Sequence, residues 1–171
     1  MSSAPELTSR REIVIITKLR GIFSCIQEGA MIALGSDHGG FALKQAVIKH
    51  LEARGENYYD FGTYTEESCD YPDYGKAVAH AVADGKYEFG IIICGTGIGI
   101  SIAANKVPGI RAALCGDCFS AEATRSHNNA NILAMGARVV GEGLALKIVD
   151  TFLDTPFSND ERHIRRINKI E

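Results

Sequence analysis

A cysteine and a glycine-rich segment form the most reactive combination in this chain. The segment GTGIG occupies positions 95–99 and directly follows Cys94, the last residue of an apolar run. Glycines permit close approach of the backbone, and the N–H groups at the start of a helix attract an anion. The same environment favours a thiolate. We therefore predict an anion-binding nest beside a reactive Cys94, in preference to a simple tight turn with a core cysteine.

Further acid–base groups stand at the ends of other predicted elements. Asp37 and His38 follow the first apolar run, and His127 closes a predicted helix. A carboxylate and an imidazole at a strand end suggest a functional role, although Asp37 is also a suitable helix cap. His127 could equally offset the dipole at the C-terminal end of its helix.

Three arginines are candidate phosphate ligands, because a guanidinium binds phosphate through two parallel hydrogen bonds. They are Arg138, Arg162 and Arg166, and the last two lie four residues apart on one helical face. The competing interpretation is a solvated basic face, to which we assign the neighbouring Arg165 and Lys169.

Two other interpretations of the loops remain open. A dinucleotide-binding module would use the segment 95–99 with Asp117 as the ribose-binding acid, but position 100 is Ile where the third glycine is expected. A Walker-type phosphate loop fails, because Lys followed by Ser or Thr is missing after the glycines. Cys115 and Cys118 form a C-x-x-C that would suit a thiol oxidoreductase. A zinc site would need a second pair of ligands, which we do not find.

Short apolar runs alternate with amphipathic stretches along the chain. Strands are predicted at 31–35, 57–61, 89–94, 111–114 and 131–135, and helices at 41–54, 73–83, about 98–106, 118–128, 141–153 and 159–170. The run 89–94 is apolar at every position, as expected of a strand covered on both faces. The alternation predicts an α/β fold, a doubly wound, five-stranded parallel sheet with helices on both faces. Its carboxyl edge should gather residues 35–40, 94–99, 115–117 and 136–138.

Length and composition favour one soluble, cytoplasmic domain. The 171 residues carry 18 basic and 21 acidic side chains, a net charge of -3 that argues against nucleic-acid binding. We find no apolar run near the ~20 residues of a membrane span and no signal peptide. Five cysteines, an odd number, indicate a reducing compartment. We assign the domain to 31–171. Residues 1–30 are interpreted as an extension upstream of a start at Met31, with an added strand or helix at 12–19 as the alternative.

Taken together, these motifs resemble the type B ribose-5-phosphate isomerases and their sister galactose-6-phosphate isomerases. The matching stretches, in order, are GSDHGGFALK (35–44), DFGTYTEESCDYPDYG (60–75), IICGTGIGISIAANKVPGIRAA (92–113), SHNNANILAMGARVVG (126–141) and ERHIRRI (161–167). The resemblance extends from Met31 to the C-terminus and leaves residues 1–30 outside.

The resemblance implies an enzyme of the pentose phosphate pathway that interconverts ribose 5-phosphate and ribulose 5-phosphate without metal or cofactor. Cys94 would move the proton between C2 and C1, and Thr96 would shuttle the hydroxyl protons. His127, helped by Asp37, would open the sugar ring. The implied substrate-binding residues are Asp37, His38, Gly95, Thr96, Gly97, Ile98, Gly99, Asn128, Arg138, Arg162 and Arg166. The family forms homodimers with shared active sites, so the helix at 159–170 should contact the partner subunit, in a dimer or a dimer of dimers.

One stretch departs from the family pattern. Family members often carry glycines before the final Arg-His pair, where this chain has Ser158-Asn159-Asp160-Glu161. These acids could attract Arg162 and weaken its hold on phosphate. An allose or galactose 6-phosphate isomerase is the alternative within the class. Because the galactose 6-phosphate enzymes commonly lack the histidine in one subunit type, His127 together with Arg138 favours the pentose phosphate.

Overall fold

The computed structural model describes residues 31–171, and the interpretations of residues 1–30 lie outside this range. A single five-stranded sheet forms the centre of the fold, and every pair of neighbouring strands is parallel. The strands are β1 (Met31–Ser36), β2 (Asn57–Asp60), β3 (Phe89–Cys94), β4 (Ala112–Leu114) and β5 (Ile132–Gly136). Their order in the sheet is β2-β1-β3-β5-β4, so β5 lies between β3 and β4. The predicted parallel α/β sheet is thereby confirmed.

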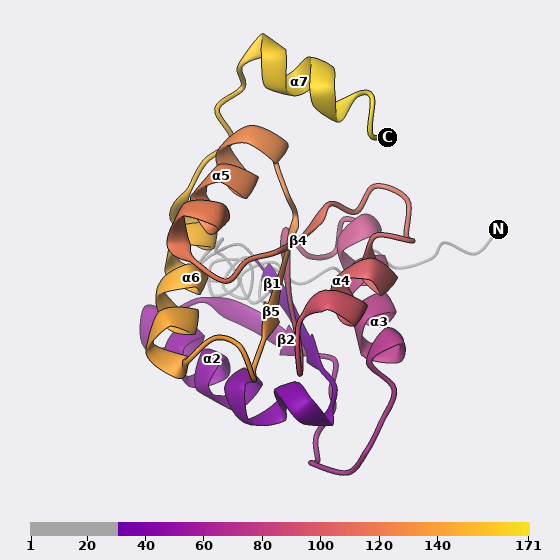
Figure 1. Ribbon diagram of the computed structural model, residues 1–171, viewed down its shortest axis with the longest axis vertical. Coiled ribbons are helices and arrows are strands. Elements are labelled where there is room, and N and C mark those ends of the chain that lie inside the picture. The colour runs from indigo at the N-terminus through magenta and orange to yellow at the C-terminus, as the bar shows by residue number, and fades with distance from the viewer. Residues whose placement is uncertain (1–30) are drawn as a thin grey trace, which may run out of the picture.

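Helices cover both faces of this sheet (Figure 1). They are η1 (His38–Gly40), α2 (Phe41–Arg54), α3 (Tyr71–Ala83), α4 (Ile98–Ala104), α5 (Cys118–Asn128), α6 (Glu142–Asp154) and α7 (Glu161–Ile167). Helices α2, α5 and α6 pack on one face, and α3 and α4 pack on the other. Helix α7 extends beyond the C-terminal end of α5, at one end of the molecule. Among residues 31–171, no helix combines the length and apolar character needed to cross a membrane.

Local sequence explains most element boundaries. Gly55 ends α2 in the left-handed conformation, with φ 74°, as expected for a glycine cap. Helix α3 begins at Tyr71, two residues before the predicted start, because Pro72 is favourable in a first turn. Helix α7 is shorter than predicted. Asn159 has a φ of 57°, which is incompatible with a right-handed helix, so α7 starts only at Glu161.

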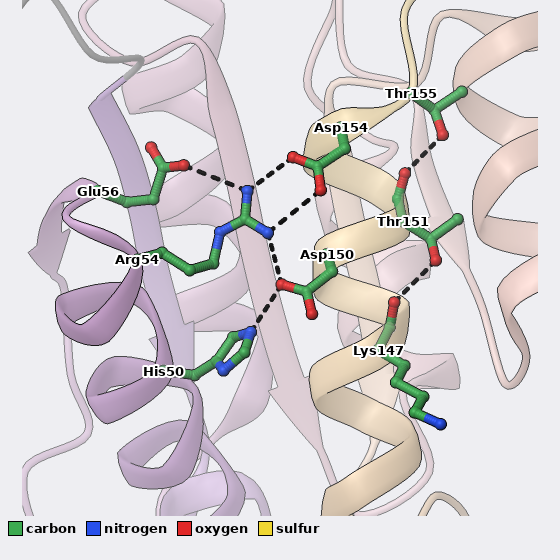
Figure 2. A network of polar contacts seen from close by, with 8 residues as sticks. All are labelled: His50, Arg54, Glu56, Lys147, Asp150, Thr151, Asp154 and Thr155. Carbon is green, nitrogen blue, oxygen red and sulfur yellow. Dashed lines mark hydrogen bonds and ion pairs between the residues drawn. The ribbon is translucent and has the colours of Figure 1, made fainter.

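A charged clasp joins α2 to α6 on the sheet face that they share (Figure 2). Arg54 donates hydrogen bonds to Asp150 over 2.6 Å and to Asp154 over 2.7 Å, and a longer one to Glu56. His50 Nε2 lies 2.6 Å from the same Asp150 oxygen. Residues about one hundred positions apart in the chain are thus held together at the edge of the core.

Candidate active site

The carboxyl ends of β1, β3 and β5 lie side by side, as the topology predicts. Cys94 is in register with Gly136, and Ser36 with Ile93. The loops that follow are also joined: Arg138 N donates to the Gly95 oxygen over 3.0 Å. This edge therefore brings together the loops after three strands that are distant in the sequence.

The segment 95–99 forms a tight loop that turns one of its backbone N–H groups toward the Cys94 side chain. Gly97 adopts a φ of 76°, and its N–H donates to Cys94 Sγ over 3.1 Å. A Cβ at Gly97 would lie 2.4 Å from a Leu114 methyl group and 2.7 Å from the Met135 carbonyl carbon. Only glycine satisfies both the dihedral and the space. Cys94 itself is buried, whereas Thr96 is exposed beside it.

The turn containing Asp37 and His38 packs against this loop. A Cβ built on Gly39 would lie 3.4 Å from the backbone nitrogen of Gly95. Asp37 accepts a hydrogen bond from Gly40 N over 2.9 Å, so it does cap the short helix η1. His38 Nδ1 accepts from the Cys69 N–H over 3.2 Å, which leaves Nε2 of the ring unengaged by that contact.

Arg138 lies over the first glycine of the loop. Its guanidinium carbon would be 3.5 Å from a Cβ at Gly95, and its side chain is exposed. Of the three candidate phosphate ligands, Arg138 is the one that the structure places beside Cys94 within the same chain.

Sequence reasoning missed Tyr71, whose ring packs on the last glycine of the loop. A Cβ at Gly99 would meet the Tyr71 Cζ atom at 2.6 Å and its hydroxyl oxygen at 3.0 Å. Tyr71 opens α3, far from the loop in sequence, and it is 40% exposed. An aromatic residue before a proline gave no signal of this contact, which arises only from the packing of α3 against α4.

Sequence reasoning also missed a buried ion pair behind the Asp37 turn. Lys44 has no exposed surface, and its Nζ atom contacts the Asp60 carboxylate at 2.5 and 2.6 Å and the Thr63 carbonyl oxygen at 2.7 Å. Burial lowers the pKa of Lys44, and the contact with Asp60 opposes that shift only in part. Thr63 N donates to the Ser36 oxygen over 2.7 Å, so the pair anchors a loop beside the last residue of β1. In the sequence, the indication of this buried pair is a single lysine within the apolar face of α2.

The remaining candidate residues lie at the opposite edge of the sheet. Helix α5 starts after the carboxyl end of β4 and runs back toward the amino ends of the strands, where His127 and Asn128 end it. There Arg111, the residue before β4, donates to the Asn128 oxygen over 3.0 Å. Strand β5 alone, with five residues, separates the two edges by roughly 13 Å. Within one chain, His127 is therefore not brought to Asp37 or Cys94.

The arginines of α7 accompany His127 at this edge. Arg162 and Arg166 are exposed, and Arg162 lies 3.4 Å from the Asp160 carboxylate. The acidic residue Asp160 therefore does interact with Arg162, as the sequence predicts. Helices α5 and α7 are in contact, and the ring of His163 packs against that of His127.

The structure argues against the two alternative functions of the carboxyl edge. Asp117 caps α5, where it accepts from Ser120 N and Ser120 Oγ, both over 2.8 Å, and these contacts lower its pKa. A ribose-binding acid would need that carboxylate free. Burial raises the pKa of Cys115 to about 11, which disfavours the thiolate that a redox cysteine requires. Cys115 and Cys118 are both free thiols.

A cavity of about 400 Å³ adjoins the glycine loop at this edge. Its walls include Thr96, Ile98, Leu114 and Val139. In residues 31–171, no three His, Cys, Asp or Glu side chains gather closely enough to hold a metal ion. What the edge offers is a buried thiol, a loop of backbone donors, an imidazole and a guanidinium, a set suited to a small anionic substrate.

Known proteins resemble this chain over nearly all of the described residues. A family profile described as Ribose/Galactose Isomerase matches residues 32–170. Ribose-5-phosphate isomerase B of Escherichia coli is 50% identical over 139 residues, 81% of this chain and 93% of that protein. A D-erythrulose-4-phosphate isomerase of Pectobacterium atrosepticum is 46% identical over 127 residues, 74% of this chain and 84% of that protein. The solved structure of Clostridium thermocellum ribose-5-phosphate isomerase B is 56% identical, with a TM-score of 0.80, and the match covers 82% of this chain and 94% of that one.

Proposed function

The chain belongs to the ribose/galactose isomerase family, and from this membership we propose that it interconverts ribose 5-phosphate and ribulose 5-phosphate. The observation that carries the proposal is the Cys94 sulfur, which lies 3.1 Å from the Gly97 nitrogen at the carboxyl edge of the sheet. A base beside a set of backbone donors suits a reaction in which a C–H proton is removed and an enediolate forms.

In the proposed reaction, the Cys94 thiolate removes the proton from C2 of the open-chain aldose and returns it to C1. The electron pair of the broken C–H bond moves into the enediolate, whose negative oxygen the N–H groups of the segment 95–99 stabilise. The Thr96 hydroxyl transfers the proton between O1 and O2, which completes the exchange of carbonyl and hydroxyl groups. Thr96 is exposed at the loop, and its Oγ1 already accepts from the Ile98 N–H over 3.3 Å.

Ring opening and phosphate binding need residues from both edges of the sheet. His127, with Asp37, donates the proton to the ring oxygen, and Arg138, Arg162 and Arg166 bind the phosphate. His38, Asn128, Gly95 and Ile98 complete the substrate contacts. Because the sheet separates His127 from Cys94 in one chain, we infer a homodimer in which each site takes its base from one subunit and its ring-opening acid from the other.

Exposed apolar side chains around the glycine loop support this dimer. Ile98 and Ile102 on α4, Leu114 at the end of β4, Phe119 on α5 and Val139 are each between 44% and 78% exposed. A two-fold axis would pair this surface with itself and form two identical sites. A dimer of dimers would leave the sites unchanged. We assign the activity to residues 31–171, with α7 at the partner subunit, and place the enzyme in the pentose phosphate pathway of the cytoplasm.

The proposal is tested by turnover of candidate substrates and by removal of the thiol. We expect a higher kcat/KM for ribose 5-phosphate than for allose or galactose 6-phosphate, and the reverse order would assign the hexose alternative. Cys94→Ala should abolish turnover of the preferred substrate while its binding is retained. Cys118→Ala, at the other end of the edge, is the matched control and should keep activity. Full activity of Cys94→Ala would refute the mechanism.

A further inference from the structure

The buried ring of His163 supports the exposed ring of His127. The two ring centroids are 4.5 Å apart, and the ring planes meet at 43°. His163 belongs to α7 and is 4% exposed, whereas His127 ends α5 and is exposed. One side of the His127 imidazole is thus covered by a second imidazole while the remainder of the ring faces outward.

A serine holds the supporting ring and joins it to α5. His163 Nδ1 lies 2.8 Å from Ser158 Oγ, and the two share a hydrogen bond. The backbone N–H of Ser158 donates to the Ser126 oxygen over 3.1 Å, one residue before His127. The orientation of His163 is therefore tied to the last turn of the helix that carries His127.

The surroundings of the two rings disfavour a proton on His163. Two imidazolium ions in contact would repel each other, so one ring of the pair stays neutral. Burial lowers the pKa of His163, and Arg162, His127 and Arg166 lower it further, against the opposing effect of the Asp160 carboxylate. That carboxylate lies 4.0 Å from Nδ1 and is half exposed.

We propose that His163 is a positioning residue for ring opening, which fixes the plane of the His127 imidazole. The inference rests on the proposed function, in which His127 protonates the ring oxygen of the cyclic sugar. It predicts that His163 matters only for substrates that must be opened. A four-carbon aldose 4-phosphate cannot form the five-membered ring, because its O4 atom is esterified, so it bypasses this step.

The test compares His163→Ala and His163→Phe on ribose 5-phosphate and on erythrose 4-phosphate. We expect His163→Ala to lower kcat/KM for ribose 5-phosphate by roughly ten- to a hundredfold, the cost of a misplaced catalytic group. Turnover of erythrose 4-phosphate should change less than about threefold, well below that cost. His163→Phe, which keeps a flat ring under His127, should recover most of the loss.

Two controls separate positioning from folding. Both substrates carry a phosphate, so a variant in which α7 simply unfolds, with loss of Arg162 and Arg166, would slow both equally. That outcome, or an unchanged rate of His163→Ala on ribose 5-phosphate, would overturn the role of His163. Arg165→Ala, on the exposed side of α7, should match the wild type on both substrates. Wild-type protein without ribose 5-phosphate activity would instead refute the proposed function.

A second readout does not depend on turnover. The ring protons of His127, identified by their loss in His127→Asn, should show a ring-current shift from His163 in the NMR spectrum of the full protein. The shift should disappear in His163→Ala and persist in His163→Phe. Signals of His127 that are identical in the wild type and His163→Ala would exclude the supporting contact.

Discussion

The backbone N–H of Gly97 donates a hydrogen bond to the sulfur of Cys94 over 3.1 Å. The two residues are only three positions apart, yet the contact requires the positive φ of Gly97 and the close packing of that residue against Leu114 and Met135. The thiol and the donors of the loop are therefore one rigid unit whose geometry depends on a single glycine.

Replacement of Gly97 by alanine should disrupt this unit. The new Cβ would meet the Leu114 methyl group at 2.4 Å and would be strained at φ 76°, so the loop must shift away from Cys94. We expect kcat to fall by about a hundredfold or more, the cost of a misplaced catalytic group. Gly85→Ala is the matched control, because Gly85 has a φ of 71° and open space around it. It should cost about 1 kcal/mol of stability and leave kcat unchanged; equal kcat in the two variants would contradict the role of Gly97.

Mixing two inactive variants should restore activity. In a dimer with shared sites, Cys94→Ala and His127→Asn damage different halves of each site, so a mixed dimer contains one intact site and one doubly altered site. Random exchange of subunits should recover about a quarter of wild-type activity. The measurement is turnover after denaturation and refolding of an equimolar mixture. Each variant refolded alone is the control, and a mixture no more active than the two alone would place both groups in the same half of the site.

Lys44→Met should destabilise the protein strongly. It removes a cation with no exposed surface and leaves the Asp60 carboxylate, which is 17% exposed, without its partner. Loss of one member of a buried pair costs about 3–5 kcal/mol, whereas replacement of both by apolar residues is often neutral. Chemical denaturation should therefore show a large decrease in the free energy of unfolding for Lys44→Met. The double variant Lys44→Met/Asp60→Leu should recover most of that decrease. Lys49→Met, at an exposed position of α2, should change the free energy of unfolding little. A double variant as unstable as the single one would show that the pair contributes net stability beyond its desolvation cost.

The clasp between α2 and α6 should make stability depend on pH. Burial alone would raise the pKa of Asp150, but hydrogen bonds from His50 and Arg54 outweigh it, and the pKa lies below the ordinary 3.8. The charged carboxylate is thus favoured in the folded state. Its stabilisation is present above the unfolded pKa and is lost as pH falls through the lower, folded pKa. Asp150→Asn should accordingly lower Tm at pH 7, and the difference from the wild type should shrink at about pH 3.

A surface pair provides the comparison for this pH experiment. Asp84 and Lys86 lie 3.1 Å apart, and both side chains are more than half exposed. Solvent screening makes such a pair weak, so Asp84→Asn should leave Tm nearly unchanged at either pH. A Tm difference for Asp150→Asn that is the same at pH 7 and pH 3 would exclude the charge of Asp150 as its source.

Sequence patterns within single helices and strands predict most of the fold. The bounds of β3 and α5 agree with the sequence prediction residue for residue, because a continuous apolar run and a helical repeat are properties of neighbouring positions. The same holds for the Cys94 loop, whose glycines follow the strand directly. The predicted start of α7 at residue 159 is too early, because Asn159 adopts the left-handed conformation, which an asparagine permits but does not require.

The residue pattern therefore predicts the helices and strands and the reactive groups at their ends. Which of these ends meet depends on the three-dimensional packing. Strand β5 lies between β3 and β4, so Cys94 is beside Gly136, and the return of α5 across the sheet carries His127 to the far edge. The contacts of His163 with His127 and of Lys44 with Asp60 likewise join separate elements. Such contacts follow from how twisted sheets and helices pack in three dimensions, so they cannot be predicted from local periodicity.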